Sequence, residues 1–284
     1  MCPSLLTAIK NISEFKTNDL RNYFTTYAIR INAVGEQLEY YVKDAISGSF
    51  KSMKEEPDRY RGIFSYLGNQ NNPPDLIIKE GDAFEVKKIQ SFKSSLALNN
   101  SPPKSQLSCD DPRITSQCRG VDGGQWSSKE IFYVIGWVQK GKIKYLYFVQ
   151  GRCYAAEKEI YERRAVGLKR NIDSYFASEG LEATRTSELG RINRMDPLGI
   201  TNFRIRGMWE IQNPIRVFSY LYKYDKRRDF SLIALMLKNK FDSFPKRDID
   251  SLMADEQIDV RDVEIKNPNN PAELLDAKLI TLSW

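Results

Sequence analysis

Residues 74–88, reading PDLIIKEGDAFEVKK, predict a β-hairpin in which both strands and the turn are marked. Residues 76–78 form an apolar run of high β propensity, and residues 83–89 form a second strand-like run. Gly81 and Asp82, between the two runs, are residues that favour a turn. The stretch therefore predicts two paired strands, and hence a fold that contains a β-sheet.

The charged residues of this hairpin are expected on one surface. Side chains alternate across a strand, so Glu85 and Lys87 face away from Phe84 and Val86, and the hairpin can bring Asp75 beside them. Two neighbouring carboxylates repel each other, and a hard divalent cation such as Mg²⁺, which prefers oxygen ligands, relieves that repulsion. A lysine beside such a metal can position or deprotonate an attacking water. The pattern favours metal-dependent hydrolysis.

A second interpretation of the same residues stays open at this point. Glu-x-Lys pairs are common on strands, and charged side chains on a solvated face are the default. Glu80 and Asp82 lie close by in the sequence, and we interpret them as turn residues that contact solvent.

The composition limits the chemistry that is available. The chain has 284 residues, 41% of them hydrophobic, which is ample for a core, and its formal net charge of +6 is compatible with a polyanionic partner. It contains no histidine, which excludes Ser-His-Asp and Cys-His catalysis and His-dependent zinc sites. For an enzyme, carboxylate, lysine and metal chemistry is then the leading option.

The cysteines and the apolar segments indicate a cytoplasmic protein. No CxxC pair is present, so we expect reduced thiols rather than a zinc ribbon or disulfides. We expect no membrane span and no secretory signal, because no stretch reaches 18 apolar residues and the first residues lack a basic region. The four cysteines are Cys2, Cys109, Cys118 and Cys153.

The first half of the chain predicts helices and then strands. Helices are expected at 3–16 and 19–31, and a third at 33–46 has Glu39 on or beside its apolar face. Residues 48–62 are expected to form a loop, 63–67 a short strand, and 68–74 a turn-rich loop. The core face of the third helix is expected to consist of Leu38, Tyr41, Val42 and Ala45.

The middle of the chain alternates between polar and apolar stretches. Residues 90–125 show little apolar periodicity and read as a long functional loop. Strands are expected at 130–138 and 143–150, the first of them central because nearly every position is apolar. A basic amphipathic helix follows at 155–176, and its inward residues are expected to be Ile160, Ala165, Leu168, Ile172 and Phe176.

Residues 185–216 contain six arginines and no lysine. A guanidinium fork matches guanine O6 and N7, or a phosphate. Residues 201–206, TNFRIR, alternate as a strand that places Arg204 and Arg206 on one face. Nucleic-acid recognition and a salt-bridged strand face remain alternatives here.

The remaining sequence predicts core strands or a helix–strand pair at 217–241, a helix at 245–254, and two strands around an Asn-Pro turn near the end. With no repeat and no clear linker, we expect one domain over residues 1–284. Its catalytic core is expected at about 33–150, and its DNA-recognition elements at about 90–125 and 185–216.

The sequence resembles the NgoPII-type type II restriction endonucleases, which carry a PD…ExK motif like Asp75, Glu85 and Lys87. The likeness runs from about residue 35 to the end and is far more specific than that motif alone. It lies in the blocks GEQLEYYVKDAISGSF, FSYLGNQNNPPD, GDAFEVKKIQS, SPPKSQLSCDD, ELGRINRMDPLGIT, FRIRGMW and KNPNNPAELLDAKLIT.

This resemblance implies an α/β (α+β) fold with the restriction-endonuclease-like PD-(D/E)xK core, a mixed central sheet flanked by helices. It implies a bacterial homodimer that cuts double-stranded DNA at a short palindrome, GGCC, leaving a 5′-phosphate and a 3′-hydroxyl. Mg²⁺ would be held by Asp75, Glu85 and the Val86 carbonyl, Lys87 would serve the attacking water, and Glu39 would support the metal site. No nucleotide cofactor is expected.

For DNA contacts we favour six residues of the two recognition elements, and Asn69 in the loop before Asp75, whose alternative role is to satisfy a turn. The six are Lys104, Ser105, Arg191, Arg194, Arg204 and Arg206. Two other functions stay open: a repair or junction nuclease of the same fold, and a DNA-binding module without activity.

Overall fold

The structure is a computed structural model that describes residues 3–20, 34–51, 56–69, 72–186 and 188–284. It consists of two compact units. Unit 1 comprises Met1–Ser94, Ser105–Ala155 and Gln212–Trp284, and unit 2 comprises Ser95–Lys104 and Ala156–Ile211. The single domain expected over residues 1–284 stays a prediction. No helix in the described ranges is long and apolar enough to cross a membrane.

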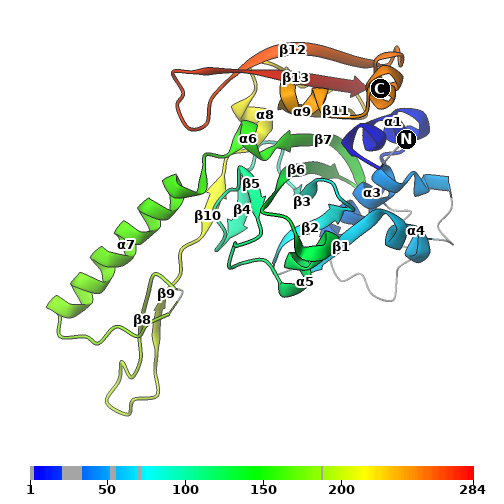
Figure 1. The fold of residues 1–284 in the computed structure, drawn as a ribbon. Helices are drawn as coiled ribbons and strands as arrows, with labels where there is room; N and C mark the ends of the chain where they lie inside the picture. Colours follow the sequence, from blue (N-terminus) through cyan, green and yellow to red (C-terminus); the bar gives the residue numbers. More distant parts are fainter. Residues whose placement is uncertain (1–2, 21–33, 52–55, 70–71, 187) are drawn as a thin grey trace. The chain divides into compact units, whose positions relative to one another are not determined.

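A nine-stranded mixed sheet forms the centre of unit 1, in the order β1-β2-β3-β6-β7-β11-β13-β12 with β5 beside β6 (Figure 1). The β3–β6 and β7–β11 pairs are parallel, and the other pairs are antiparallel. The strands are β1 (Phe64–Asn69), β2 (Asn72–Ile78), β3 (Ala83–Ile89), β5 (Gln106–Ser108), β6 (Ser128–Gln139), β7 (Lys142–Gln150), β11 (Ser231–Leu237), β12 (Ile258–Lys266) and β13 (Leu274–Ser283).

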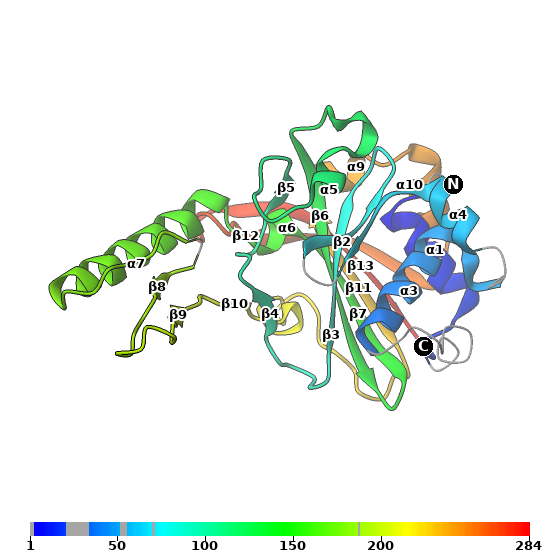
Figure 2. The same ribbon diagram turned by 90° about the horizontal axis from the view of Figure 1, so that it is seen from below.

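Helices flank this sheet, which confirms the expected fold class. Figure 2 shows α1 and α3 side by side along one face, and the core between helices and sheet is built from apolar side chains of both. The helices of unit 1 are α1 (Leu5–Phe15), α3 (Val34–Ser47), α4 (Glu56–Ile63), α5 (Ser116–Arg119), α6 (Gly151–Tyr154), α8 (Pro214–Val217), α9 (Lys238–Asp242) and α10 (Lys246–Met253), with short 3₁₀ turns at Ser49–Lys51 and Val121–Gly124.

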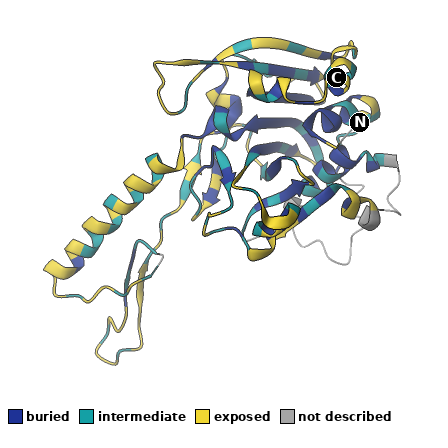
Figure 3. Ribbon diagram, in the orientation of Figure 1, coloured by how far each residue is buried: buried dark blue, intermediate teal, exposed yellow. Residues whose placement is uncertain are grey.

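Several expected elements are confirmed because strong apolar periodicity fixed them. The predicted core face of α3, Leu38, Tyr41, Val42 and Ala45, is fully buried. Strand β6 is buried from Ile131 to Ile135, as expected for a central strand covered on both faces (Figure 3). The helices expected at 3–16 and 245–254 and the two last strands are also present. The helix expected at 19–31 lies almost entirely outside the described residues.

Three expected loops contain helices or strands, so these predictions are wrong. Within residues 48–62, expected as loop, the described part contains a 3₁₀ turn and most of α4. The helix is anchored by Tyr60, whose ring packs edge-on against Phe64 and whose hydroxyl donates to Asp44 Oδ1 at 2.5 Å. Within 68–74, the described residues mostly belong to β1 and β2. Likewise, residues 90–125 include β4 (Leu96–Asn99), β5 and α5.

Unit 2 contains the long helix α7 (Lys158–Ser178), a two-stranded sheet of β8 (Gly190–Ile192) and β9 (Phe203–Ile205), and a second one of β4 and β10 (Trp209–Ile211). Of the residues expected to face inward on α7, Phe176 is buried, but Leu168 is 56% exposed, so that part of the prediction is wrong. The helix packs mainly through its C-terminal end, where Gly190 lies directly under Ile172 and Phe176.

Candidate active site

The β2–β3 hairpin places the three candidate catalytic residues on one side of the sheet. Leu76 pairs with Phe84 and Ile77 pairs with Ala83, a register that sets Asp75 against Glu85. Leu76 and Phe84 are fully buried in the helix–sheet core. Because side chains alternate, Asp75, Glu85 and Lys87 project from the opposite side. The apolar face of each strand therefore fixes the direction of its charged face, as predicted.

The contacts within this group are short. Asp75 Oδ2 accepts a hydrogen bond from the Val86 main-chain N–H at 2.6 Å. Lys87 Nζ lies 2.6 Å from Glu85 Oε1. The other carboxylate oxygen, Glu85 Oε2, is buried and has no hydrogen-bond partner among the described residues. A buried acceptor without a partner is costly, so this oxygen is available for a cation.

Glu39 acts on the same site from helix α3, which packs against β3. Its charge contributes to the pKa shifts of both Asp75 and Lys87. One turn further along the helix, Lys43 Nζ lies 4.0 Å from Glu39 Oε2. The structure thus brings Glu39 within electrostatic range of the hairpin, as its position beside the apolar face of α3 suggested.

The electrostatics show a carboxylate cluster that is short of positive charge. Burial, then the charges of Glu85 and Glu39, raise the pKa of Asp75 well above its usual range, against the opposing effects of Lys87 and the Val86 N–H. Burial lowers the pKa of Lys87, but the charges of Glu85 and Asp75 outweigh it and the pKa is raised. One ammonium group is therefore shared by several carboxylates.

This donor set fits a divalent metal. The described residues contain no group of three or more Cys, Asp or Glu side chains arranged to hold a metal by themselves. A cation here would have two carboxylates, those of Asp75 and Glu85, together with main-chain oxygen and water. That set suits Mg²⁺, which binds through one or two carboxylates and keeps several waters.

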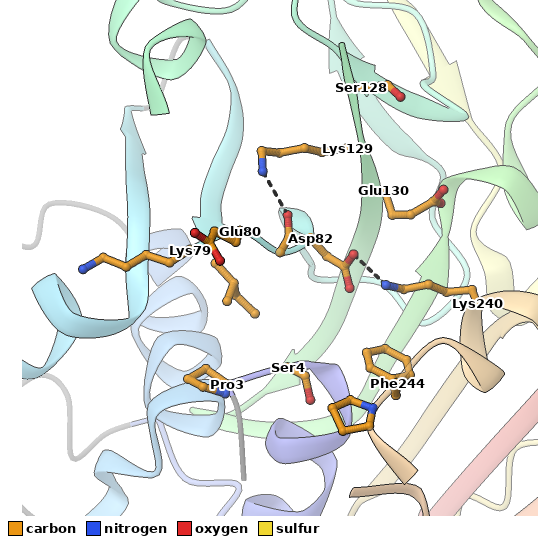
Figure 4. A pocket seen from close by; sticks show the side chains of 13 residues that line it. Pro3, Ser4, Lys79, Glu80, Asp82, Ser128, Lys129, Glu130, Lys240 and Phe244 are labelled. Atoms are coloured by element: carbon orange, nitrogen blue, oxygen red, sulfur yellow. Dashed lines mark hydrogen bonds and ion pairs between the residues drawn. The ribbon is translucent and has the colours of Figure 1, made fainter. Parts of the chain in front are cut away.

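A separate pocket of about 430 Å³ lies beside the β2–β3 turn (Figure 4). Asp82, interpreted above as a solvated turn residue, is only 8% exposed and its Oδ1 lies 2.7 Å from Lys240 Nζ, so that interpretation is wrong. Lys129, also in the pocket wall, pairs with Asp122 at 2.7 Å. Both lysines are thus paired with carboxylates, and the Lys240–Asp82 ion pair ties the β2–β3 turn to α9.

The candidate DNA contacts outside the arginine-rich stretch lie in less accessible positions than expected. Lys104 is 8% exposed and Ser105 is 5% exposed. Asn69 Oδ1 accepts a hydrogen bond from the Asn72 N–H at 3.1 Å, which is the turn-satisfying role considered as its alternative. A role of these residues in DNA binding stays a prediction.

The arginines of the β8–β9 hairpin differ in how they are held. Arg204 Nη2 and Arg206 Nε contact Glu188 Oε1 at 2.5 and 2.8 Å, and Arg191 Nε donates to Asn193 Oδ1 at 2.9 Å. Arg194 has no partner among the described residues, and its backbone lies in the left-handed region at φ 59°. Arg204 and Arg206 share one face, as predicted, and Glu188 joins them.

Glu188 is a residue that the sequence did not single out. Its carboxylate is 12% exposed, and hydrogen bonds from Arg204 and Arg206 lower its pKa to about 2. The only sequence signal is an acidic residue within an arginine-rich run, and spacing does not reveal which arginines it meets.

A mixed sheet flanked by helices, with Asp75, Glu85 and Lys87 on one β-hairpin, is the arrangement expected of a nuclease of the restriction-endonuclease class. The family model described as NgoPII restriction endonuclease matches residues 3–266, and the chain belongs to that family. The type II restriction enzyme NgoPII of Neisseria gonorrhoeae is 45% identical over 254 residues, covering 89% of this chain and 90% of the relative. No solved structure matches the chain significantly.

This membership confirms the expected enzyme class, a restriction endonuclease, and DNA as its substrate class. Enzymes of this type generally use a divalent metal ion. The roles of individual residues, the identity of the metal and the sequence that is cut are developed below as proposals.

Proposed function

We propose that this protein is a Mg²⁺-dependent type II restriction endonuclease that cuts double-stranded DNA within a short palindrome, GGCC, as part of a restriction-modification system. The observation that carries the proposal is the β2–β3 hairpin, where Asp75, Glu85 and Lys87 meet and Glu85 Oε2 is buried without a partner. The 45% identity to the type II restriction enzyme NgoPII supports the choice of DNA as substrate.

Asp75 and Glu85 would hold the metal, with the Val86 carbonyl as a third oxygen. Bound Mg²⁺ supplies charge neutralisation for the phosphate and lowers the pKa of a bound water. The Val86 N–H fixes the orientation of Asp75 through its 2.6 Å hydrogen bond. Lys87 orients the attacking water and balances the negative charge of the reacting phosphate. Glu39 adds negative charge at the same place from α3. The products are a 5′-phosphate and a 3′-hydroxyl.

Sequence readout is proposed for the arginines of the β8–β9 hairpin. Glu188 accepts hydrogen bonds from Nε and Nη2 of Arg204 and from Nε of Arg206, which leaves other N–H groups of both guanidinium groups for base edges. A bidentate arginine–guanine pair discriminates by about 1–3 kcal/mol. Arg191, Arg194, Lys104, Ser105 and Asn69 are secondary candidates. Arg204→Ala and Arg206→Ala proteins with unchanged affinity and site preference would contradict this assignment.

A palindromic site implies two symmetry-related active sites, so we propose a homodimer. Its test is the molar mass of the protein in solution, measured with and without a duplex that contains one site. A monomer on DNA that still cuts both strands in one binding event would overturn the dimer without affecting the catalytic proposal.

The decisive experiment is a digest of a fully sequenced phage DNA by the purified protein, with and without Mg²⁺. Discrete fragments with ends at GGCC, only with Mg²⁺, are the expected result. Discrete fragments with ends at another sequence would support Mg²⁺-dependent cleavage and contradict GGCC as the recognition site. Random nicks would favour a repair nuclease, and tight binding without cleavage in any divalent metal would favour a DNA-binding module.

A further inference from the structure

The loop between β8 and β9 presents large apolar side chains to solvent. Leu198 is 80% exposed and Ile200 is 77% exposed. Met195 before them is 46% exposed, and Phe203 after them is 49% exposed. Single exposed apolar residues need no explanation, but a cluster of them in one short loop marks a surface that contacts something.

This loop is tightly built around Asp196. Its Oδ2 accepts from the N–H groups of Ile200 at 3.2 Å and Thr201 at 2.6 Å, and its Oδ1 accepts from Leu198 N–H at 3.0 Å. Main-chain bonds close the loop, since Met195 N–H donates to Thr201 O at 2.8 Å. The carboxylate thus fixes the backbone at both aliphatic residues, and their exposure is imposed by the structure of the loop.

Gly199 and Arg194 both have left-handed backbone conformations in this loop and lie against each other. Gly199 has φ +69°, and a Cβ at this position would meet the Cγ of Arg194 at 3.4 Å, so the arginine stem lies along the glycine. Arg194 is itself in the left-handed region at φ 59°. For a non-glycine residue that conformation costs about 1–2 kcal/mol. Strain of this kind persists where the surroundings hold a residue in place and concentrates at functional sites.

The charge of the hairpin indicates what this surface contacts. Residues 188–207 contain four arginines and two acidic residues: Glu188 pairs with Arg204 and Arg206, and the oxygens of Asp196 are occupied by the loop N–H groups. Arg194 has no partner in the described ranges. An apolar tip between guanidinium groups matches a nucleic-acid groove, where arginines contact phosphates and Leu, Ile, Met, Phe or Pro side chains enter between base pairs.

We infer that the Met195–Thr201 loop is a wedge that inserts Leu198 and Ile200 into a groove of the substrate duplex and unstacks one base step. This inference rests on the proposed function, because the duplex is the proposed substrate. Asp196 is the positioning residue of the wedge, and Arg194 anchors it to the adjacent phosphate. The arginines held by Glu188 follow on β9.

The test uses duplexes that carry the site found in the phage digest, with 2-aminopurine placed singly at successive positions in and beside it. Its fluorescence rises when stacking is lost. The proteins are wild type, Leu198→Ala/Ile200→Ala and, as a matched control, Leu168→Ala, whose side chain is 56% exposed on α7 of the same unit. Binding is measured with Ca²⁺ in place of Mg²⁺, and cleavage with Mg²⁺.

A fluorescence rise at one step is expected with wild type and with Leu168→Ala, and its loss is expected with the double variant. The double variant should also bind on the order of tenfold more weakly. Wild-type protein that cuts its site without any fluorescence rise would overturn the wedge and leave the proposed function intact. Failure of wild type to bind or cut DNA would overturn both.

A different result would assign the loop to a subunit contact. If the double variant has a lower molar mass in solution than wild type and Leu168→Ala, the apolar side chains join two copies of the chain and the wedge is overturned. An Asp196→Asn variant gives an independent check. If the loop is a wedge, this variant should show a smaller fluorescence rise than wild type although it keeps Leu198 and Ile200, because the loop backbone is no longer held by the carboxylate.

Discussion

The β2–β3 and β8–β9 hairpins both carry acidic and basic residues, but they keep them in different states. In β2–β3 the charges are partly buried and unbalanced: Glu85 Oε2 has no partner in the described ranges and the pKa of Asp75 is raised. In β8–β9 the charges are balanced, because Glu188 joins Arg204 and Arg206, whose side chains are 43% and 58% exposed. The first arrangement is suited to binding a cation, and the second to holding side chains for a partner.

The difference follows from what lies behind each hairpin. Behind β2–β3 is the helix–sheet core, which fixes the direction of every side chain and excludes water. Among the described residues, the apolar support of β8–β9 comes from the C-terminal end of α7, through Ile172 and Phe176. A hairpin with so little apolar support depends on ion pairs and loop hydrogen bonds for its shape. An unbalanced carboxylate cluster suits the catalytic role proposed for β2–β3, and paired arginines suit the recognition role proposed for β8–β9.

The largest effect is expected for Lys87→Ala. Removing the ammonium next to the reacting phosphate should lower the cleavage rate by about 10²–10⁴-fold, the usual contribution of a group that orients or transfers a proton. Binding of the site with Ca²⁺ should be retained. The measurement is single-turnover cleavage of a duplex with one site.

Lys88→Ala is the matched control, since Lys88 is the next residue of β3 and projects from the other side of the strand. Its cleavage rate should stay close to that of wild type. Equal losses in the two variants would show that general charge rather than the position of Lys87 matters. Wild-type cleavage by Lys87→Ala would remove Lys87 from the catalytic proposal.

The second effect concerns metal binding. Saturating Mg²⁺ should raise the melting temperature of the wild-type protein. At a hundredfold excess of Mg²⁺ over Kd, the free energy of unfolding should increase by about 2.7 kcal/mol. Asp75→Asn should abolish most of this rise and should melt higher than wild type without metal, because it removes one of the mutually repelling carboxylates.

Glu80→Gln serves as the control for this measurement, since Glu80 is an exposed carboxylate in the same hairpin turn. It should respond to Mg²⁺ as wild type does. A melting temperature of Asp75→Asn that rises with Mg²⁺ as far as wild type would remove Asp75 from the metal site.

The third effect compares how tightly the two units are packed, by substituting one glycine in each unit. A Cβ at Gly136 in β6 would lie 2.6 Å from Leu38 Cδ2, and Leu38 is fully buried in α3, next to Glu39. Gly136→Ala should destabilise unit 1 by about 1–3 kcal/mol, as overpacked cores do. Gly167 in α7 has nothing within 4 Å of its Cβ position, so Gly167→Ala should stabilise the helix by up to about 1 kcal/mol.

Thermal unfolding followed by hydrogen exchange separates the two units in this experiment. Gly136→Ala should also slow cleavage, since it displaces the helix that carries Glu39. If Gly136→Ala unfolds at the wild-type temperature, the α3–β6 contact is looser than the structure shows.

The sequence predicted the structure of the β2–β3 hairpin well because the information for it is local. A two-residue alternation and one turn signal place Glu85, Lys87 and Asp75 on one side whatever the rest of the chain does. Glu39 followed from helical spacing in the same way. The partner of Glu85 Oε1 and the orphan state of Oε2 required the three-dimensional structure.

Non-local information explains the failures. Residues around Tyr60 form a helix because one aromatic ring reaches Phe64 and Asp44, which no local pattern reveals. Leu168 fits the apolar period of α7, but no described element covers it. Asp82 is buried because Lys240 reaches it from α9, more than 150 residues later in the chain. Glu188 joins two arginines across a hairpin whose register the sequence left open.

The smallest effect concerns the pH dependence of the β8–β9 hairpin. The folded-state pKa of Glu188 is about 2, below the usual value of 4.5, because Arg204 and Arg206 hydrogen-bond its charged form. A lowered pKa means that the ion pairs are fully present above pH 4.5 and are lost as the pH falls toward 2. Amide protection of Ile192 and Ile205, corrected for intrinsic exchange, should stay constant from pH 7 to pH 5 and fall below that.

Glu188→Gln should show lower protection of these amides and no dependence on pH in this window, whereas Glu182→Gln, at another acidic position of unit 2, should behave as wild type. The effect is small because exposed ion pairs contribute little to stability. Equal protection in Glu188→Gln and wild type would mean that the hairpin keeps its shape without the arginine contacts. Glu188 would then position the arginine side chains without stabilising the hairpin. The shape of the β8–β9 hairpin would depend on the hydrogen bonds of its loop alone.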